Sequence, residues 1–284
     1  MKRAKSYYLS IIWGVLFSQM SLIAFAQNDN VSYKHENTLG FIDHSDNKKE
    51  KAVMVAIGAA NVLDTYLSAE QYKGTEFRII AENRSKISPK RLSHLLSHHG
   101  CFTSLDNRAG NSNEISGVYN FQYFIYYHWR IAHHWSVQAG GGIDAQLGVL
   151  YNTRNTNNPV QVDASLQLSP SSSITYKNII NKRFFQIRYA ASFPLAGLMF
   201  SPNYGQSYYE IFSKDNYDHN VVPTTIFSTP SLQHSLTFDY QLFKNKPDSK
   251  IRIGYLGDLR QSKVNNIKRH HYAHMLLIGW VHNI

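Results

Sequence analysis

Hydrophobic and polar residues alternate over long stretches of this chain. In residues 118–131, VYNFQYFIYYHWRI, the odd positions from 119 onward are all apolar or aromatic. The polar residues fall among the even positions: Asn120, Gln122, His128 and Arg130. Successive side chains of a β-strand point to opposite faces. The pattern therefore predicts a strand with one apolar face and one largely polar face.

The next stretch, residues 135–151, alternates in the same way, and only His133 and His134 separate the two. This arrangement predicts a long hairpin with a tight turn. The same pattern recurs along the chain and predicts ten strands. Their approximate ranges are 52–63, 72–84, 91–104, 116–131, 135–151, 160–176, 183–193, 232–243, 250–261 and 269–284.

The length and alternation of these strands favour a membrane protein. Strands of soluble sheets average about 5 to 6 residues, whereas 116–131 and 135–151 are far longer. A transmembrane barrel turns its apolar residues toward lipid and its polar residues inward. We therefore predict an all-β fold, a closed antiparallel transmembrane β-barrel of about ten strands. The alternative, a soluble sandwich or lipocalin-like barrel, would place the apolar face inside.

The connections between the predicted strands differ in length. Short turns fall near 85–90, 133–134, 177–182 and 244–249, and we assign them to the periplasm. The other connections are mostly longer and are expected outside the cell. The longest, 194–231, could hold one more hairpin, which would raise the number of strands to twelve. The last strand carries alternate apolar residues almost to the final position, as barrels of the outer membrane commonly do.

The N-terminus has the parts of a cleavable signal peptide. Basic residues precede an apolar run over 9–17, and Ala24-Phe25-Ala26 follows. This order predicts a signal peptide over 1–26, cleaved after Ala26. Residues 27–51 are polar and predict a periplasmic lead-in, and 52–284 would form the barrel. The alternative is a membrane anchor, for which the run is short and interrupted.

The charge balance narrows the expected partners. The chain has 29 Lys and Arg against 19 Asp and Glu, a net charge of +10. The predicted signal peptide holds three of the basic residues, so the mature chain would carry +7 (29 − 3 − 19). Such a surplus suits phosphate-bearing lipid, and export argues against nucleic acid. We expect contact with outer-membrane lipid and lipopolysaccharide, with the barrel-assembly machinery during insertion, and with envelope proteins. The single cysteine, Cys101, cannot form an internal disulfide.

Charged residues share the polar face of the strand at 72–84. They are Glu76, Arg78, Glu82 and Arg84. Each Arg would cost about 2 to 4 kcal/mol if it faced lipid at the bilayer midplane. The pattern therefore predicts a charge ladder within a lumen filled by charged and polar side chains. Because barrels of about eight strands are filled and open channels need about sixteen, a general porin is disfavoured, and a narrow small-solute channel ranks third.

Polar residues gather in the predicted outer loops and suggest a binding site. Amide, phenol and guanidinium groups suit sugar hydroxyls and phosphates. The candidates are Asn152, Arg154, Asn155, Asn158, Tyr204, Gln206, Tyr208 and Tyr209. The alternative is that these loops satisfy each other's polar groups and close the lumen.

A second set of loop residues suggests a lipid hydrolase. Ser207, Glu210 and His219 lie in one connection, and Asp64 and Thr65 could lie beside them. A nucleophile needs a base within about 2.6 to 3.2 Å, which sequence alone does not establish. No metal or cofactor is expected, because the acidic residues near 215–220 lack a recognised calcium-loop spacing.

Several blocks carry a family resemblance. They are GLMFSPNYGQSYYEIF at 197–212, NYDHN at 216–220, LDTYLS at 63–68, YKG at 72–74, NTRNTNNP at 152–159 and RIGYLGD at 252–258. Through them the chain resembles a domain-of-unknown-function family (3316) of predicted outer-membrane β-barrel proteins from Bacteroidetes-type bacteria. The resemblance implies location and architecture, but no activity. We expect a non-enzymatic outer-membrane barrel acting in surface binding, adhesion or envelope assembly, with the lipid hydrolase as the alternative.

Overall fold

A computed structural model describes residues 49–88, 91–243 and 245–284, and these residues form mostly β-strands. The predicted signal peptide and most of the lead-in lie outside the described residues. The strands are β1 (Glu50–Asp64), β2 (Tyr72–Ser88), β3 (Leu92–Asn107), β4 (Asn113–Arg130), β5 (Trp135–Asn152), β6 (Val160–Ile180), β7 (Arg183–Ser192), β8 (Ala196–Phe200), β9 (Val221–Thr225), β10 (Leu232–Tyr240), β11 (Ser249–Val264) and β12 (Ile267–Asn283). One short helix, α2 (Tyr208–Ser213), precedes β9.

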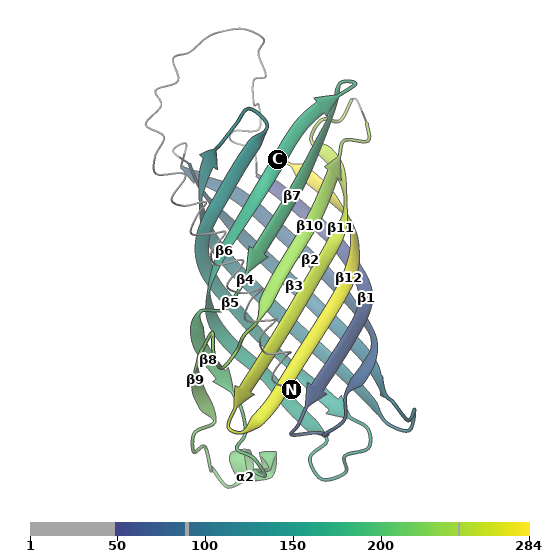
Figure 1. Cartoon of the computed structure of the whole chain (residues 1–284), viewed down its shortest axis with the longest axis vertical. Helices are drawn as coiled ribbons and strands as arrows, with labels where there is room; N and C mark the ends of the chain where they lie inside the picture. The colour runs from purple at the N-terminus through teal and green to yellow at the C-terminus, as the bar shows by residue number, and fades with distance from the viewer. Residues whose placement is uncertain (1–48, 89–90, 244) are drawn as a thin grey trace.

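The strands form one antiparallel sheet that closes on itself (Figure 1). The first strand, β1, pairs with the last, β12, and β5 pairs with both β4 and β6. The closed ring has ten strands, β1–β7 and β10–β12, while β8 and β9 extend the sheet beyond β6. This confirms the predicted antiparallel barrel of about ten strands.

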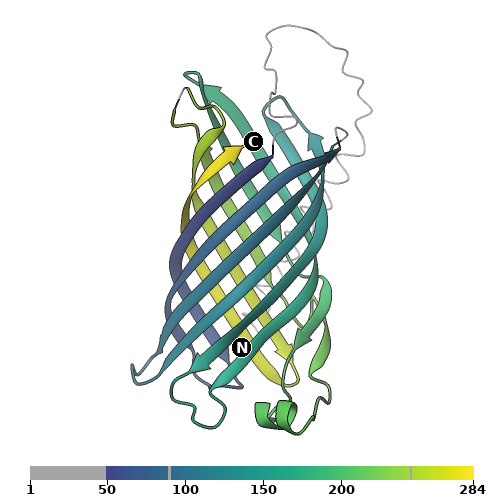
Figure 2. The same cartoon turned by 180° about the vertical axis from the view of Figure 1, so that it is seen from behind.

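The two ends of the barrel differ. We call the end where β1 begins and β12 finishes the terminal end, and the opposite end the loop end (Figure 2). The loop end carries the connections 65–71, 108–112, 153–159 and 201–220, whereas the turn 181–182 at the terminal end has two residues. The exception at the loop end is a two-residue turn, Asn265-Asn266, with φ angles of 49° and 61°. Asparagine tolerates this left-handed backbone, which tight hairpin turns require.

Two strands of the barrel are interrupted near their middles. Ser171 pairs with Ser192 on β7, but Leu168 pairs with Ala196 on β8. Three steps along β6 (171 to 168) therefore match four along its partner (192 to 196), which is a one-residue β-bulge. Hydrogen bonds from Phe193 N to Pro170 O and from Leu195 N to Leu168 O bridge the break. In effect, β8 prolongs β7 along β6.

The neighbouring strand has a larger break. On β7 and β8, Ser192 and Ala196 are four steps apart (192 to 196), while their partners Gln233 and Thr225 are eight steps apart (225 to 233). Four extra residues therefore lie between β9 and β10. The predicted extra hairpin in the long connection exists as β8 and β9, but it prolongs two existing strands and adds no further barrel strands.

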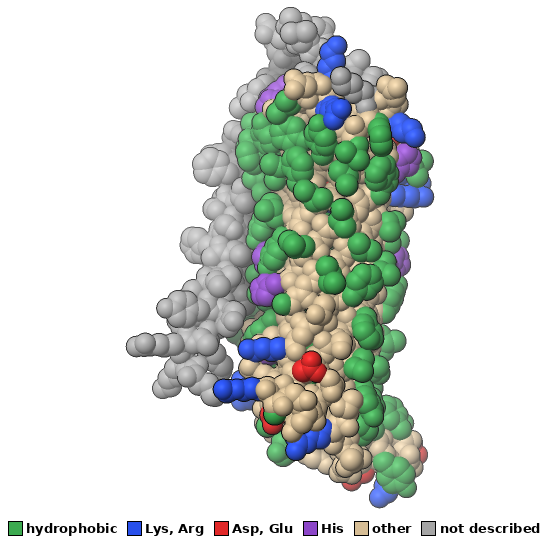
Figure 3. All heavy atoms as spheres, turned by 90° about the vertical axis from the view of Figure 1, so that its right-hand side faces the viewer, with side chains coloured by type: hydrophobic (Ala, Val, Ile, Leu, Met, Phe, Trp, Pro, Cys, Tyr) green, Lys and Arg blue, Asp and Glu red, His purple; other side chains and the backbone are tan. Residues whose placement is uncertain are grey.

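The outer face of the barrel is apolar. On β12, Leu276 is 72% exposed and Ile278 and Trp280 are also exposed, while Met275 and Leu277, at alternate positions, are buried. Figure 3 shows hydrophobic side chains over the wall and basic side chains nearer the two ends. A closed sheet with an apolar exterior is the architecture of outer-membrane barrels. The chain is therefore a transmembrane β-barrel of the outer-membrane type.

No helix within the described residues is long and apolar enough to cross a membrane.

One inner wall departs from the predicted polar lumen. The inward side chains of β1 and β12, with neighbours from β2 and β11, form an apolar cluster. Its members are Ala52, Met54, Ala56, Ile80, Leu256, Ala273, Met275, Leu277 and Val281. Because β1 and β12 are largely apolar on both faces, alternation alone does not reveal which of their residues point inward. The remaining inner walls are largely polar, as β6 shows with Ser169, Ser171, Ser173 and Thr175.

Replacing Leu276 with Arg is expected to destabilise the barrel. Leu276 lies between Tyr272 and Trp280 on the lipid-facing side, and a guanidinium there costs about 2 to 4 kcal/mol. The free energy of unfolding, measured by guanidinium titration of the barrel in lipid bilayers, should fall by that amount. Lys268→Arg on the same strand keeps the charge at an exposed site and serves as the control. A loss for Leu276→Arg no larger than for the control would contradict the lipid-facing assignment.

Candidate functional site

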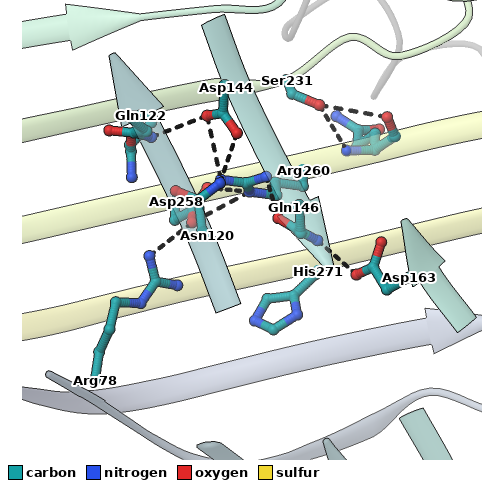
Figure 4. A network of polar contacts seen from close by, with 12 residues as sticks. Arg78, Asn120, Gln122, Asp144, Gln146, Asp163, Ser231, Asp258, Arg260 and His271 are labelled. Carbon is teal, nitrogen blue, oxygen red and sulfur yellow. Dashed lines mark hydrogen bonds and ion pairs between the residues drawn. The ribbon is translucent and has the colours of Figure 1, made fainter. Parts of the chain in front are cut away.

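A layer of charged and polar side chains crosses the interior of the barrel (Figure 4). Its first part is centred on Arg78 of β2, which is 3% exposed. Arg78 Nη1 donates to Asp258 Oδ2 of β11 at 2.8 Å, and its Nε donates to Glu76 Oε1 at 2.9 Å. Glu76 also contacts His271 Nε2 of β12 at 2.5 Å. Both buried carboxylates therefore have partners, which buried charges need.

The second part of the layer is centred on Arg260 of β11. Arg260 Nε donates to Asp258 Oδ1 at 3.0 Å, so that Asp258 lies between two guanidinium groups. Arg260 also donates to Gln146 of β5 and lies 3.6 Å from Asp144 Oδ2. These contacts reach from β11 across the interior to β5.

Amide side chains complete the layer. Asp144 accepts from Asn120 Nδ2 at 2.6 Å and from Gln122 Nε2 at 2.9 Å, both on β4. Gln122 Nε2 also donates to Gln233 Oε1 of β10 at 2.7 Å. The layer thus connects opposite walls through long-range hydrogen bonds and divides the lumen into two chambers.

The loop-side chamber has a volume of about 110 Å³ and an excess of carboxylates. Its lining includes four carboxylates, Asp64, Asp144, Asp163 and Asp258, and two guanidinium groups, Arg260 and Arg269. With neutral histidines the lining charge is −2 (2 − 4). His270, His271, Ser165, Gln167 and Ser169 also line this chamber. It can therefore hold a small group that carries positive charge or many hydrogen-bonding atoms.

The terminal-side chamber has the opposite charge. Its volume is about 90 Å³, and its charged lining is Glu82, Arg84, Arg188 and Arg252, a sum of +2 (3 − 1). Arg252 donates to Asp239 at 2.6 and 2.8 Å and to Glu82 at 3.2 Å. The two chambers therefore differ in charge on either side of the layer.

The four residues of the predicted ladder lie in two separate networks. Glu76 and Arg78 belong to the layer, while Glu82 bonds to Arg252, and Arg84 Nη1 donates to Gln138 Oε1 at 3.1 Å. Ile80, which is 2% exposed, lies between the two pairs on the same face of β2. The alternation on β2 predicts that these charges point inward, but it does not predict this separation.

The long connections at the loop end pack on one another. We call connections 65–71, 153–159 and 201–220 together the cap. Tyr66 Oη donates to Gln206 O at 2.9 Å, and Asn155 Nδ2 donates to Leu67 O at 3.0 Å. Tyr208 Oη donates to Gln161 Oε1 of β6 at 2.8 Å. These bonds join all three connections and the barrel rim, as expected for loops that close a lumen.

Most of the candidate ligand-binding residues have partners within the protein. Asn152 Nδ2 donates to Tyr72 Oη at 3.0 Å and to Glu114 Oε1 at 2.9 Å, and its Oδ1 accepts from Arg154 N and Asn155 N. Asn155 Oδ1 in turn accepts from Asn158 N at 3.0 Å. The amide and turn contacts of this loop therefore hold its own backbone in place.

The candidates in 201–220 divide into two groups. Gln206 accepts from Asn203 N and Asn220 Nδ2 and donates to Asn216 O at 2.9 Å, so it organises its own loop. Tyr204 and Tyr209, by contrast, are largely exposed to solvent. The cap therefore presents aromatic rings such as Tyr204 and Tyr209 to the solvent, together with charged side chains such as Lys214 and Asp218.

Ser207 and Glu210 form the N-terminal cap of α2. Ser207 Oγ accepts from Glu210 N at 3.2 Å, and Glu210 Oε2 accepts from Ser207 N at 2.8 Å. This reciprocal pair is a capping box, which an S-x-x-E pattern before a helix predicts. The hydrogen bonds from Ser207 lower the pKa of the Glu210 carboxyl. The two residues thus have a structural role that their spacing alone could have indicated.

The other hydrolase candidates lie in separate contacts. His219 contacts Asp218 on the exposed surface. Asp64 pairs with Arg269 Nε at 2.8 Å, and Thr65 Oγ1 accepts from Lys268 N at 2.8 Å. Within the described part of the chain, no hydrogen bond joins His219 to Ser207 or Glu210, and no cluster of His, Cys, Asp and Glu could hold a metal. Ser207 Oγ donates to Glu210 Oε2 at 3.1 Å within the capping box, and His219 is not joined to this pair.

Replacing Arg78 with Met is expected to destabilise the barrel by about 3 to 5 kcal/mol, because Glu76 and Asp258 would keep buried charge without its main partner. Guanidinium titration of the barrel in lipid bilayers measures this loss. The triple variant Glu76→Gln, Arg78→Met, Asp258→Asn removes both carboxylate charges and should recover much of it. Arg154→Met at the exposed loop end should change stability by no more than about 0.5 kcal/mol. Equal effects for Arg78→Met and Arg154→Met would show that the layer does not stabilise the fold.

The cap is expected to respond to alkaline pH through Tyr66. Burial, with Asp64 and Glu210 nearby, raises the pKa of Tyr66 to about 12. The neutral phenol donates to Gln206 O, so this stabilisation is complete below about pH 10, the unfolded pKa, and is lost as the pH rises through about 12. The absorbance difference at 295 nm between the wild type and Tyr66→Phe should titrate near pH 12 when folded. In guanidinium chloride it should titrate near pH 10. A midpoint near 10 in the folded protein would contradict the buried hydrogen bond.

Several solved structures are similar to this chain, each at less than 10% sequence identity. Among solved structures, the chain is similar to the outer membrane protease OmpT from Escherichia coli, with 9% identity and a TM-score of 0.45 over 87% of this chain and 99% of that one. It is also similar to the transport unit of the autotransporter AIDA-I from Escherichia coli, with 7% identity and a TM-score of 0.44 over 86% and 92%. A third is Ail, the attachment invasion locus protein of Yersinia pestis, with 9% identity and a TM-score of 0.30 over 82% and 99%.

No curated protein matches the chain in sequence. A family model does match it, over residues 15–284. The chain belongs to the family described as "Protein of unknown function (DUF3316)".

Proposed function

We propose that this protein is a non-enzymatic, ligand-binding barrel of the outer membrane, with the loop-side chamber as its binding site. The observation that carries the proposal is an acidic chamber of about 110 Å³ directly above the charged layer. Carboxylates outnumber guanidinium groups in its lining, and such an imbalance favours a cationic ligand. Binding is thereby preferred among the predicted roles of binding, adhesion and envelope assembly.

The layer argues against a channel. Asp258 lies between Arg78 and Arg260, and Asp144 receives hydrogen bonds from two amides of β4. Moving an ion past these groups would break several buried, charge-assisted hydrogen bonds at once, each worth more than a neutral one. A ten-stranded ring also falls well below the roughly sixteen strands of open pores. We expect the barrel to be silent in conductance measurements.

The contacts at the loop end argue against the hydrolase. Ser207 and Glu210 cap α2, and Asp64 neutralises Arg269. A serine nucleophile requires an oriented base, and His219 faces Asp218 on the exposed surface instead. The polar groups of the chamber, in contrast, line a space inside the barrel, where electrostatic attraction to a ligand is stronger than in water.

Asp163 provides a direct test of binding. Asp163 accepts from Gln146 Nε2 at 2.6 Å and lies 3.6 Å from Arg269, and it lines the chamber. The probe is dodecyltrimethylammonium with a diazirine beside its head group, added to the barrel in lipid nanodiscs and located by mass spectrometry after illumination. Asp163→Asn removes one carboxylate charge without changing the side chain's shape and should lower chamber labelling by about fivefold to tenfold, which corresponds to about 1 to 1.4 kcal/mol of lost charge attraction.

The matched control is Asp106→Asn, which removes the same charge from the exposed loop end. It should leave chamber labelling unchanged. A single-chain sulfonate of equal length, with a diazirine at the same place, should label the chamber weakly. Equal labelling by both probes, or labelling outside the chamber alone, would overturn the proposed site.

A further inference from the structure

The barrel wall contains a seam between β9 and the loop half of β11. On the side of β11 that faces β10, the ladder stops before the loop end, because β10 begins at Leu232, which pairs with Leu259. Beyond that pair, residues 260–264 of β11 pair with β12 on one side and form no ladder on the other. The strand that would continue β10 is β9, and the four-residue insertion separates it from β11. We call this boundary the seam.

Few hydrogen bonds cross the seam. Ser231 Oγ accepts from Gln261 N at 3.0 Å and donates to Gln261 O at 3.3 Å. Lys263 N donates to Ser228 O at 2.9 Å. Near the turn, Asn265 Nδ2 donates to Ser201 O and His219 O. A serine hydroxyl thus satisfies the backbone of β11 where another strand would normally do so, and opening the seam breaks no ladder.

The free edge of β9 is unsuited to an added strand. Ile226 N donates to Leu195 O and Ser201 N donates to Asn220 O, which places the backbone groups of the even residues toward β8. Pro223 therefore faces the free edge, where it has no N–H to donate. A proline on an edge prevents strand pairing. The seam consequently favours a small molecule over a peptide strand.

The seam connects the lipid-facing surface with the loop-side chamber. On the outside, Leu195, Leu198 and Phe227 are exposed on the side of β8 and β9, and Phe227 is 81% exposed. On the inside, residues from both sides of the seam line the chamber. They are Phe193, Pro194, Met199, Thr229, Ser231, Gln261 and Ser262. The path thus begins at apolar side chains and leads to polar and acidic ones.

The other boundaries of the chamber are cross-linked by side chains. The layer spans the interior toward the terminal end, and the cap is held by bonds such as Tyr66 Oη to Gln206 O. We propose that the seam is a lateral entrance, through which the cationic head group of a single-chain amphiphile in the outer leaflet reaches the loop-side chamber while its hydrocarbon chain stays at Leu195, Leu198 and Phe227. This inference rests on the proposed function, because it takes the chamber as the binding site.

A disulfide across the seam tests the entrance. Ser228 and Lys263 are joined by a backbone hydrogen bond of 2.9 Å from Lys263 N to Ser228 O. This bond keeps their Cα atoms within about 6.8 Å of each other, which is within reach of a disulfide. The test variant is Ser228→Cys, Lys263→Cys, with Cys101→Ser to remove the native thiol. The matched control is Asn113→Cys, Thr153→Cys with Cys101→Ser, at the loop end away from the seam. Asn113 and Thr153 are also joined by a backbone hydrogen bond, of 3.0 Å.

Chamber labelling by the dodecyltrimethylammonium probe in nanodiscs gives the readout. Oxidation of the seam disulfide should lower the initial labelling rate by at least about tenfold, as expected when a gate controls access, and dithiothreitol should restore it. The control disulfide should change the rate by less than about twofold. Ser231→Ala, which removes both contacts with Gln261, should raise the rate and tests the seam without any disulfide.

The possible failures are distinguishable. Equal labelling in the oxidised and reduced seam variant overturns the lateral entrance and leaves the binding site intact. Loss of labelling in the oxidised control as well would place the entrance at the loop end and also overturn it. Absence of chamber labelling in the wild type and in the reduced variants overturns the binding site, and the entrance with it.

Discussion

The need to bond every backbone N–H and C=O group in the absence of water determines this structure. In hydrocarbon an unsatisfied backbone group costs several kcal/mol, so a membrane-spanning sheet must close. The chain meets this requirement by pairing β1 with β12 over fifteen residues, from Glu50 with Asn283 to Asp64 with Arg269. At the seam no backbone ladder forms. There Ser231 Oγ accepts from Gln261 N and donates to Gln261 O. A side chain can release such groups and bond them again more readily than a strand can.

Closure of the sheet also creates an interior that must be filled. The chain fills it with apolar clusters, the largest of them along β1 and β12, and with polar and charged groups between them. The apolar side chains need no hydrogen-bond partners, whereas each charged side chain in the interior needs an ion-pair or hydrogen-bond partner. Arg78, which projects from β2, finds its partner Asp258 180 residues away in the sequence. The barrel therefore depends on ion pairs that form only once most strands are in place, and we expect these contacts to form late in folding.

The sequence predicts the strands closely because alternation is a local signal. The predicted 135–151 and 160–176 correspond to β5 (Trp135–Asn152) and β6 (Val160–Ile180). The sequence does not predict features that depend on how distant strands pair. The bulge at Phe193 and the insertion before Leu232 are visible only from the register with neighbouring strands. In the candidate site, inward charges such as Glu76 follow from alternation, but their division by Ile80 and the bridging role of Asp144 depend on residues from distant strands. The capping box of Ser207 and Glu210, by contrast, could be predicted from the four-residue pattern S-x-x-E alone.

The layer, the cap and the seam differ in the free energy needed to open them. This difference favours entry into the chamber at the seam. The layer is made of buried ion pairs, whose separation leaves uncompensated charge. The cap is held by neutral hydrogen bonds from three connections, together with the edge-to-face contact of Tyr66 and Tyr208 at 5.7 Å. The seam depends on one serine hydroxyl, one backbone carbonyl and the asparagine of a turn. Fluctuations that open the wall should therefore concentrate at the seam, because net hydrogen bonds of this kind contribute only about 1 kcal/mol each. A cationic ligand that enters through the seam would then contact the acidic lining of the loop-side chamber, which does not move when the seam opens.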